Sequence, residues 1–333
     1  MSPGPRFRPT DCKDPMKPLN IKNLPTPKVE EWKYTNLGRA LPANLVMADE
    51  PQEIVIHKNR GEVCEQPEEV VFTGVDQQHS QPRLKITLEE GAQLTLIERH
   101  TGTGAYWKNM VTEIELGANA NLQHVRIQND DKQAVQTNLV HIKSARDAVY
   151  NGFALNMGGK LTRHEMHAEI EGENGEISFN GVNLLGRDQH GDTTILIEHK
   201  VPHCQSNQFY RTLLDDNAHG VFQGKVHVHQ IAQKTDGYQL SNTLLLSPEA
   251  EMDTKPELEI YADDVKCSHG ATTGQLDEEP LFYLRQRGLN ESQARQLLVQ
   301  AFVDEVIEKV EDETLRDEIL ETANTWLHTA LSK

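Results

Sequence analysis

The chain has 333 residues with 33 Lys and Arg against 51 Asp and Glu, which gives a formal net charge of −18. This charge argues against nucleic acid as a partner, because neutralising phosphates requires a positive surface, and no apolar run approaches the roughly 18 residues that a membrane helix needs. Hydrophobic residues make up 37% of the chain and aromatic residues 5%. Such a composition favours a thin, repetitive architecture that buries small aliphatic side chains over a thick helical core.

The start of the chain, residues 1–50, is interpreted as an N-terminal arm. Residues 1–40 hold eight basic and four acidic side chains, and prolines recur until the string EEWKYTNL, which begins at Glu30. Proline-rich sequence of this kind predicts an extended or poorly ordered segment. The opening string MSPGPRFRPT lacks the apolar stretch of a signal peptide. We therefore expect a cytoplasmic protein.

The cysteines fit that compartment. No CxxC pair occurs. The four cysteines are far apart in the sequence: Cys12, Cys64, Cys204 and Cys267. A disulfide framework is typical of short secreted chains, and a preformed cluster site usually has close cysteine spacing. Reduced thiols are the expectation.

The middle of the chain, residues 51–275, consists of short alternating apolar and polar runs separated by Gly, Asn and Asp. Several runs start roughly 25–30 residues apart, a spacing typical of a solenoid. No long segment of helical periodicity interrupts them. The pattern predicts a parallel β-helix, and a jelly roll or other double-sheet fold remains an alternative. Most of the acidic excess lies here, with a net charge of −15 over residues 41–276.

The end of the chain, residues 276–333, predicts three helices. Asp277 is a suitable N-cap, Pro280 falls in the first turn and Gly288 suits the position after the helix. A second helix is expected from Asn290, with Gln293 as its capping-box partner. Its predicted apolar stripe is Ala294, Leu297, Leu298, Ala301 and Phe302, and that of the third helix is Leu315, Ile319, Ala323, Trp326, Leu327 and Ala330. These stripes would close the end of the solenoid, dock a partner, or do both.

Cys267 and His269 form the most promising candidate site. They follow the strand-like run LEIYADDV, and in a continuing strand both side chains point to one face while Ser268 points to the other. A thiol beside an imidazole can act as nucleophile and base or as two metal ligands. Zinc and iron–sulfur clusters usually take four protein ligands. Two ligands indicate a site completed by another chain, although a buried Cys beside a surface His is equally compatible with the spacing.

The remaining histidines give weaker signals. His227 and His229 share a strand face, which also suits a polar stripe on an outer wall, whereas His164 and His167 face opposite sides. A further small group at a strand end comprises His199, His203 and Cys204. The sequence has no G-x-x-x-x-G-K-[ST] or G-x-S-x-G motif, and no G-x-G-x-x-G between a strand and a helix.

Three strings carry a resemblance to a known family. They are EEWKYTNL, FYRTLLDDNAHGVFQGKVHV from Phe209, and the long run from Tyr238 to Leu289 that contains KCSHGATTGQLDEE. The chain resembles the SufB/SufD family, the scaffold components of the SUF iron–sulfur cluster assembly system. The KCSHGAT string is similar to the SufD branch, whereas the SufB branch typically has HEAT at this place. Members of the family usually carry a longer helical region before the EEWKYTNL string, and only residues 1–29 precede it here. Any role of the N-terminal region in contacts with neighbouring subunits is therefore in doubt for this chain.

The resemblance implies a right-handed parallel β-helix flanked by helical segments. It also implies pairing with SufB through the C-terminal end of the β-helix and binding of the ATPase SufC through the C-terminal helices. Cys267 and His269 would then lie at the SufB interface, with His269 the better candidate for contacting a nascent cluster. This chain would be a non-catalytic scaffold without a stably bound cofactor. Because an open sheet edge at the end of a β-helix can pair with itself, the isolated chain is compatible with a homodimer as well as a monomer. The alternative is an independent β-helical carbohydrate-active enzyme, which the scarcity of aromatic residues disfavours.

Overall fold

A computed structural model describes residues 17–49 and 52–331, and the predicted arm before residue 17, with Cys12, lies outside them. The chain is a parallel β-solenoid of about eight turns that ends in helices. Every pairing among the described strands is parallel. The predicted solenoid is therefore confirmed, since a jelly roll is built from antiparallel strands.

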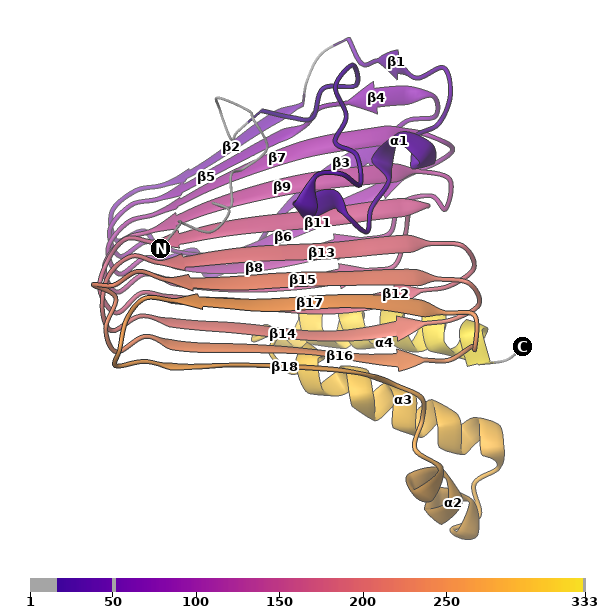
Figure 1. The fold of residues 1–333 in the computed structure, drawn as a ribbon. Coiled ribbons are helices and arrows are strands. Elements are labelled where there is room, and N and C mark those ends of the chain that lie inside the picture. Colours follow the sequence, from indigo (N-terminus) through magenta and orange to yellow (C-terminus); the bar gives the residue numbers. More distant parts are fainter. Residues whose placement is uncertain (1–16, 50–51, 332–333) are drawn as a thin grey trace.

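Two sheets form the walls of the solenoid (Figure 1). The ten-stranded sheet contains β1 (Val46–Met47), β2 (Glu53–Lys58), β4 (Gln78–Ser80), β5 (Arg83–Leu88), β7 (Trp107–Leu116), β9 (Val135–Ser144), β11 (Leu161–Ile170), β13 (His190–His199), β15 (His219–Val228) and β17 (Glu251–Ile260). The eight-stranded sheet contains β3 (Glu68–Gly74), β6 (Gln93–Gly102), β8 (Asn121–Gln128), β10 (Val149–Asn156), β12 (Glu176–Leu185), β14 (Gln205–Leu214), β16 (Asp236–Leu245) and β18 (Lys266–Gly274). From β5 onward the chain alternates between the sheets.

One corner of the solenoid explains the recurring Gly, Asn and Asp. Seven of the eight turns from the ten-stranded to the eight-stranded sheet, all but the last from β17 to β18, place one residue at a positive φ between 55° and 71°, the left-handed region that Gly, Asn and Asp tolerate best. The backbone N–H of each such residue commonly donates to a carbonyl of the next turn, as from Gly91 to Ala118 and from Asn119 to Arg146. The stacked positions are Gly61, Gly91, Asn119, Asp147, Asn174, His203 and Lys234.

The core lies between the sheets and is built mainly from inward-facing aliphatic side chains with some aromatic rings. Alternate residues of each strand face this interior because side chains alternate across a strand. The outer face of each sheet is also covered in part. Trp32 and Leu37, from the 3-10 helix η1 (Glu30–Trp32) and α1 (Leu37–Ala40), pack on Trp107, Val135 and Leu161 of the ten-stranded sheet.

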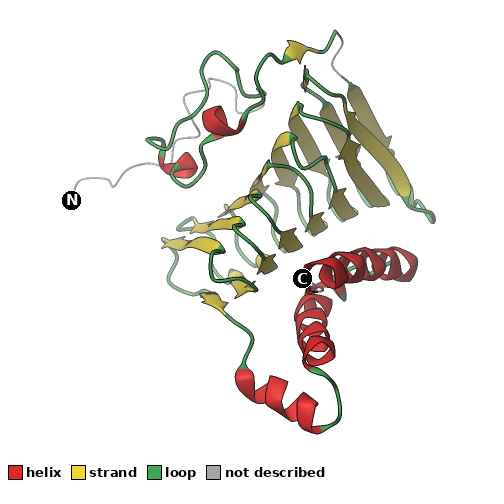
Figure 2. Ribbon diagram, turned by 90° about the vertical axis from the view of Figure 1, so that its right-hand side faces the viewer, coloured by secondary structure: helices red, strands yellow, loops and turns green. Residues whose placement is uncertain are grey.

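The C-terminal helices are α2 (Glu278–Gln286), α3 (Glu291–Ile307) and α4 (Glu313–Leu331). The predicted caps are confirmed: the Asp277 side chain accepts from the Glu279 N–H, and Asn290 and Gln293 form a capping box. Figure 2 shows the helices on one side of the solenoid and the N-terminal segment on the other. Helices α3 and α4 therefore cover the outer face of the eight-stranded sheet, and the prediction that the helices close its end is wrong.

The predicted apolar stripe of α3 is wrong in part. Leu297 is 47% exposed and Ala301 is exposed, whereas Val299 and Val303 are fully buried against the sheet and α4. Apolar residues lie on several sides of this helix, so periodicity alone does not determine which side is buried. The stripe of α4 is confirmed for its buried members, Leu315, Ile319, Ala323 and Leu327.

Candidate functional site

Cys267 and His269 lie on β18, the last strand of the eight-stranded sheet, and both face the inside of the solenoid. Their register partners on β16 are Gly237 and Gln239. A Cβ placed on Gly237 would lie 3.3 Å from the Cys267 Sγ and 3.4 Å from a methyl carbon of Val226 on the opposite sheet. The thiol therefore points between the sheets, and His269, two residues on, follows it. Because no further turn covers β18, His269 is exposed at the end of the solenoid.

The Cys267 thiol sits in an apolar pocket of the last turn. It is half-buried and packs with a small cluster that includes Val226, Val228 and Ala262. Burial is the main cause that raises the pKa of this thiol, and the charge of Asp236 raises it further. The thiol is therefore protonated at neutral pH, which disfavours its reading as an activated nucleophile. A bound metal ion would reverse this preference, because a coordinating thiol loses its proton.

Polar side chains occupy the positions in register with His269 on the two preceding strands of the sheet, β16 and β14. Gln239 and Gln208 are fully buried, and the Gln239 amide donates to the Gln208 Oε1 across 2.8 Å. Four buried polar atoms here have no hydrogen-bond partner among the described residues: Gln208 Nε2, Gln239 Oε1, Ser241 Oγ and Thr243 Oγ1. Buried polar groups normally find a partner. The last turns therefore offer unused hydrogen-bonding capacity directly behind the candidate site.

Both sheets end in an unpaired edge at this end of the molecule. Within the described chain, β17 pairs only with β15 and β18 only with β16. These two edge strands have ten and nine residues. Long open edges present rows of backbone donors and acceptors that can pair with another chain. Cys267 and His269 thus lie beside the surface most suited to receive one.

The other predicted histidine groups separate in the structure. His164 is buried inside the solenoid, whereas His167 faces outward with its Nε2 3.0 Å from the Glu165 carboxylate. The group at 199–204 does not converge. His199 is buried beside Ser206, His203 is exposed at the corner with a φ of 62°, and the Cys204 thiol donates to the Pro202 carbonyl.

A buried polar cluster in the middle of the solenoid was missed by the sequence reasoning. The Glu98 carboxylate contacts the Nε2 atoms of both His100 and His124, and Arg126 reaches Gln136 and Asn156 across 2.8 and 2.7 Å. Burial is the main cause that lowers the pKa of His100 to about 4. Alternating inward positions in LTLIERH carry the signal, because Glu98 and His100 continue the inward row of Leu94 and Leu96.

That cluster is separate from the candidate site. Four strands, β10, β12, β14 and β16, lie between β8 and β18 in the same sheet. At about 4.8 Å per strand the separation is roughly 24 Å. The cluster contains carboxylates matched by cations, as in the contact of 2.7 Å between the Lys108 Nζ and Asp130 Oδ1. Its charged groups pair with one another, and we interpret it as structural.

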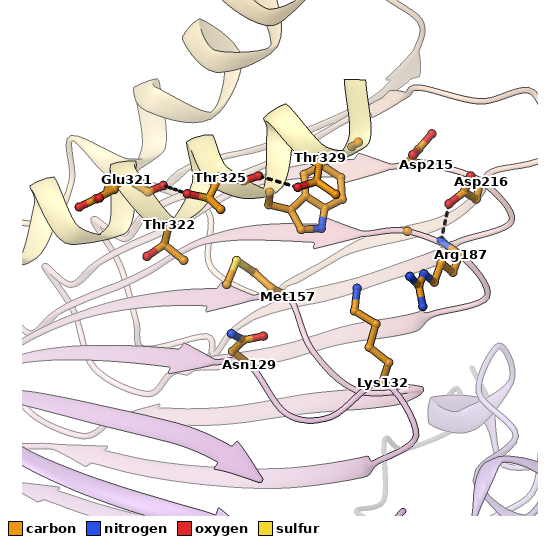
Figure 3. A pocket seen from close by; sticks show the side chains of 13 residues that line it. Asn129, Lys132, Met157, Arg187, Asp215, Asp216, Glu321, Thr322, Thr325 and Thr329 are labelled. Carbon is orange, nitrogen blue, oxygen red and sulfur yellow. Dashed lines mark hydrogen bonds between the residues drawn. The ribbon is translucent and has the colours of Figure 1, made fainter. Parts of the chain in front are cut away.

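A groove of about 500 Å³ lies between α4 and the carboxyl ends of β8, β10, β12 and β14 (Figure 3). Trp326 contributes to its wall, and Lys132 and Arg187 face it together with Asp216 and Glu321. The Arg187 N–H donates to Asp216 across 3.0 Å. The lining is of mixed charge and lies on the outside of the sheet, so the groove does not communicate with Cys267 and His269 inside it.

Comparison with known proteins identifies the family. The model of the "SUF system FeS cluster assembly, SufBD core domain" matches residues 71–302. The chain belongs to the SufB/SufD family. The iron–sulfur cluster assembly protein SufD of Escherichia coli is 37% identical over 240 residues, which cover 72% of this chain and 57% of that relative.

Two further SufB/SufD relatives agree with this placement. A SufBD family protein of Synechocystis is 39% identical over 69% of this chain and 53% of its own length, and one of Mycobacterium leprae is 30% identical over 71% and 62%. The chain therefore spans 53–62% of the length of these three relatives. Nothing in these comparisons supports the carbohydrate-active alternative. Among residues 17–49 and 52–331, no helix combines the length and the hydropathy needed to cross a membrane.

Proposed function

We propose that this chain is a non-catalytic scaffold subunit of SUF iron–sulfur cluster assembly. It pairs with SufB through the open end of its solenoid, and a nascent cluster is held transiently between the two chains. One observation carries the proposal: Cys267 and His269 face the interior beside the two unpaired edges of β17 and β18. The family membership supports the assembly role.

The edges support pairing with another β-solenoid. A partner with the same parallel architecture can continue both sheets at once, because β17 and β18 are the edge strands of the two sheets at the same end of the solenoid. Pro256 in the middle of β17 agrees with an edge position, since proline has no backbone N–H to donate to a neighbouring strand. Pairing would also bring partner side chains over the exposed His269 and the half-buried Cys267. This is how two residues become part of a complete cluster site.

Cys267 and His269 differ in how readily each can bind iron. The exposed imidazole of His269 is available without a conformational change, whereas the Cys267 thiol must lose a proton held by its raised pKa. His269 therefore makes the first contact with iron, and Cys267 joins as the bound metal withdraws the proton. The described cysteines, Cys64, Cys204 and Cys267, are free thiols, which supports a reducing compartment such as the cytoplasm.

The helices support a second partner, the ATPase SufC, in which we place ATP hydrolysis. Phe282 and Tyr283 on α2 are 64% and 56% exposed, and Leu297 on α3 is 47% exposed. Large exposed apolar side chains on consecutive helices suit a protein-binding surface. The local net charge of −7 over residues 277–333 favours a partner surface with basic side chains.

The SufC surface is tested by point substitutions. Deleting α3 and α4 would expose the apolar outer face of the eight-stranded sheet, so loss of binding in a deletion variant would be uninformative. We expect a Phe282→Asp and Leu297→Asp double variant, co-expressed with SufB and SufC and purified through this chain, to retain SufB and lose SufC. Val71→Asp, which changes a 42% exposed residue on β3, is the control and should retain both. Full retention of SufC by the double variant would contradict the assignment.

A further inference from the structure

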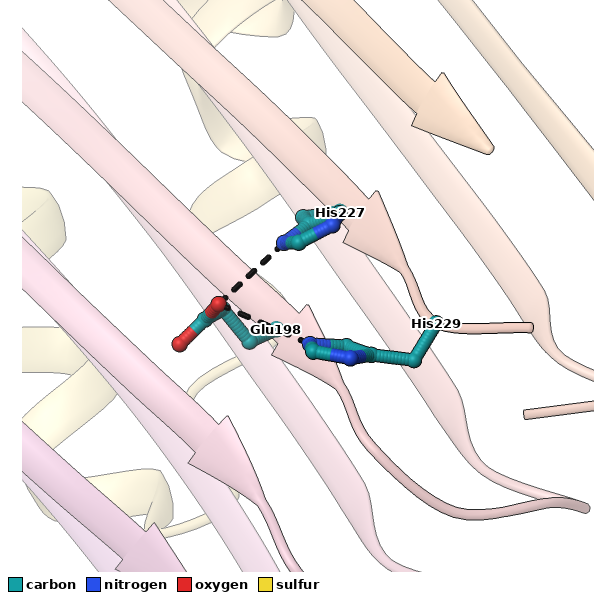
Figure 4. Close-up of side chains that lie close together, drawn as sticks. All are labelled: Glu198, His227 and His229. Atoms are coloured by element: carbon teal, nitrogen blue, oxygen red, sulfur yellow. Dashed lines mark hydrogen bonds and ion pairs between the residues drawn. The ribbon is translucent and has the colours of Figure 1, made fainter. Parts of the chain in front are cut away.

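Three potential metal ligands converge on the outer face of the ten-stranded sheet (Figure 4). The His227 Nδ1 lies 3.1 Å and the His229 Nε2 3.6 Å from the Glu198 Oε1. One ligand atom from each residue lies within 4.8 Å of the other two, and no other group of three or more such side chains does so in the described part of the chain.

The fold builds this arrangement from strand register. Glu198 on β13 and His227 on β15 are direct register partners. His229 lies two residues after His227, on the same face, and its backbone N–H donates to the His199 carbonyl across 3.0 Å, which extends the pairing past the end of β15. The two imidazole rings are 4.5 Å apart, centre to centre. The backbone thus fixes the positions of all three side chains.

The distances suit a single bound ion. Nitrogen and oxygen atoms bonded to one tetrahedral ion at about 2.0–2.2 Å lie about 3.4 Å from each other. The measured separations of 3.1 and 3.6 Å from the carboxylate oxygen bracket this value. An ordinary hydrogen bond explains why His227 lies beside Glu198, but it does not explain why the His229 Nε2 points to the same carboxylate oxygen. Its Nε2 is shielded from solvent and has no hydrogen-bond partner in the described structure.

The charges near the site also suit a cation. Glu198 is ionised at neutral pH, because its hydrogen bond with His227 is the largest cause that lowers the pKa of the carboxyl group. Two basic side chains on the same face already pair with carboxylates: Lys200 with Glu169 and Glu171, and Lys225 with Glu259. The side chains of Glu198, His227 and His229 are 29%, 22% and 39% exposed, so the site lies at the protein surface.

We propose that Glu198, His227 and His229 bind one divalent transition-metal ion. Two imidazole nitrogens and one carboxylate form a ligand set that zinc and ferrous iron accept, whereas calcium and magnesium prefer oxygen ligands alone. Three protein ligands leave at least one position open to water. The site is separate from Cys267 and His269, because His227 faces outward while its neighbour Val226 faces the thiol inside.

The test uses cobalt as a spectroscopic probe of the purified full chain carrying Cys267→Ser and His269→Ala, so that the interior ligands cannot contribute. We expect saturable binding of one Co²⁺ with visible absorption, and displacement by Zn²⁺. Glu198→Gln, His227→Gln and His229→Gln should each weaken binding by about 10- to 100-fold or more. Circular dichroism checks that each variant keeps its β structure.

The matched control is His57→Gln. His57 lies 3.2 Å from the Glu89 carboxylate and is 49% exposed, but no second imidazole joins this pair. The control should bind Co²⁺ as tightly as its parent. The proposal is overturned if the parent binds no ion in this way, or if the three substitutions change the affinity no more than His57→Gln does.

Discussion

His199 is fully buried on the inner face of β13, where its Nε2 lies 2.8 Å from the Ser206 hydroxyl. Burial alone lowers the pKa of its imidazole to about 4 from an ordinary 6.5. The folded protein therefore holds this residue neutral, whereas the unfolded chain takes up a proton near pH 6.5. Protonation favours the unfolded state, so the stability that His199 contributes is present above pH 6.5 and is lost as the pH falls toward 4.

We predict that lowering the pH from 7 to 5 costs about 2 kcal/mol in the free energy of unfolding through His199 alone. The His199→Gln variant should lack this part of the decline, since glutamine does not titrate. Urea unfolding of both proteins at the two pH values measures the difference. An identical pH dependence in the two proteins would show that His199 does not titrate on unfolding.

At the scale of elements, the EEWKYTNL segment is a strap across the ten-stranded sheet. The ring of Trp32 lies 4.2 Å from the guanidinium of Arg163 on β11, and Thr35 contacts His190 and Asp192 on β13. The Lys255 Nζ on β17 lies 2.7 Å from Glu30. Together with the packing of Trp32 and Leu37 on β7, β9 and β11, the strap therefore spans six adjacent strands, from β7 to β17, and contacts the edge strand of the open end.

We predict that Trp32→Ala releases the strap while leaving the solenoid folded. Truncating a buried Trp costs about 3 kcal/mol or more, which raises the undocked fraction roughly 100-fold. Limited trypsin digestion should then cleave faster after Lys33 and Arg39. Lys33→Ala removes an exposed side chain and should not loosen the strap. Equal cleavage rates after Arg39 in the two variants would argue against docking through Trp32.

Sequence reasoning succeeds for features with local causes and fails for those that depend on distant partners. The turn residues and the caps at Asp277 and Asn290 are local, and they are found where expected. The side of α3 that is buried depends on the sheet it meets, so Leu297 was misplaced. Glu198 and His227 are separated by one full turn of the chain, and no spacing rule joins them before the register is known.

At the scale of the whole molecule, the solenoid is protected along its walls and open at its C-terminal end. Helices α3 and α4 cover one wall and the strap covers part of the other. The edges of β17 and β18 have no such cover within the described chain. An exposed edge of this length favours association with another strand-rich chain.

We predict that the isolated chain forms a homodimer through these edges and that SufB displaces one copy. Sedimentation analysis of the isolated chain should give twice its mass. A Thr254→Lys and Thr273→Lys double variant should be monomeric, because lysines on edge strands oppose pairing. Val55→Lys on β2, an edge strand at the other end of the solenoid, is the control. A dimer that persists in the double variant would place the contact elsewhere.

The central claim is that His269 contacts iron at the interface with SufB. The most direct measurement is the iron recovered with the complex after co-expression with SufB and SufC and purification through this chain. We predict that His269→Ala lowers the recovered iron while the three chains still purify together, whereas Ser268→Ala, on the opposite face of β18, leaves it unchanged. Undiminished iron in an intact His269→Ala complex would contradict the account.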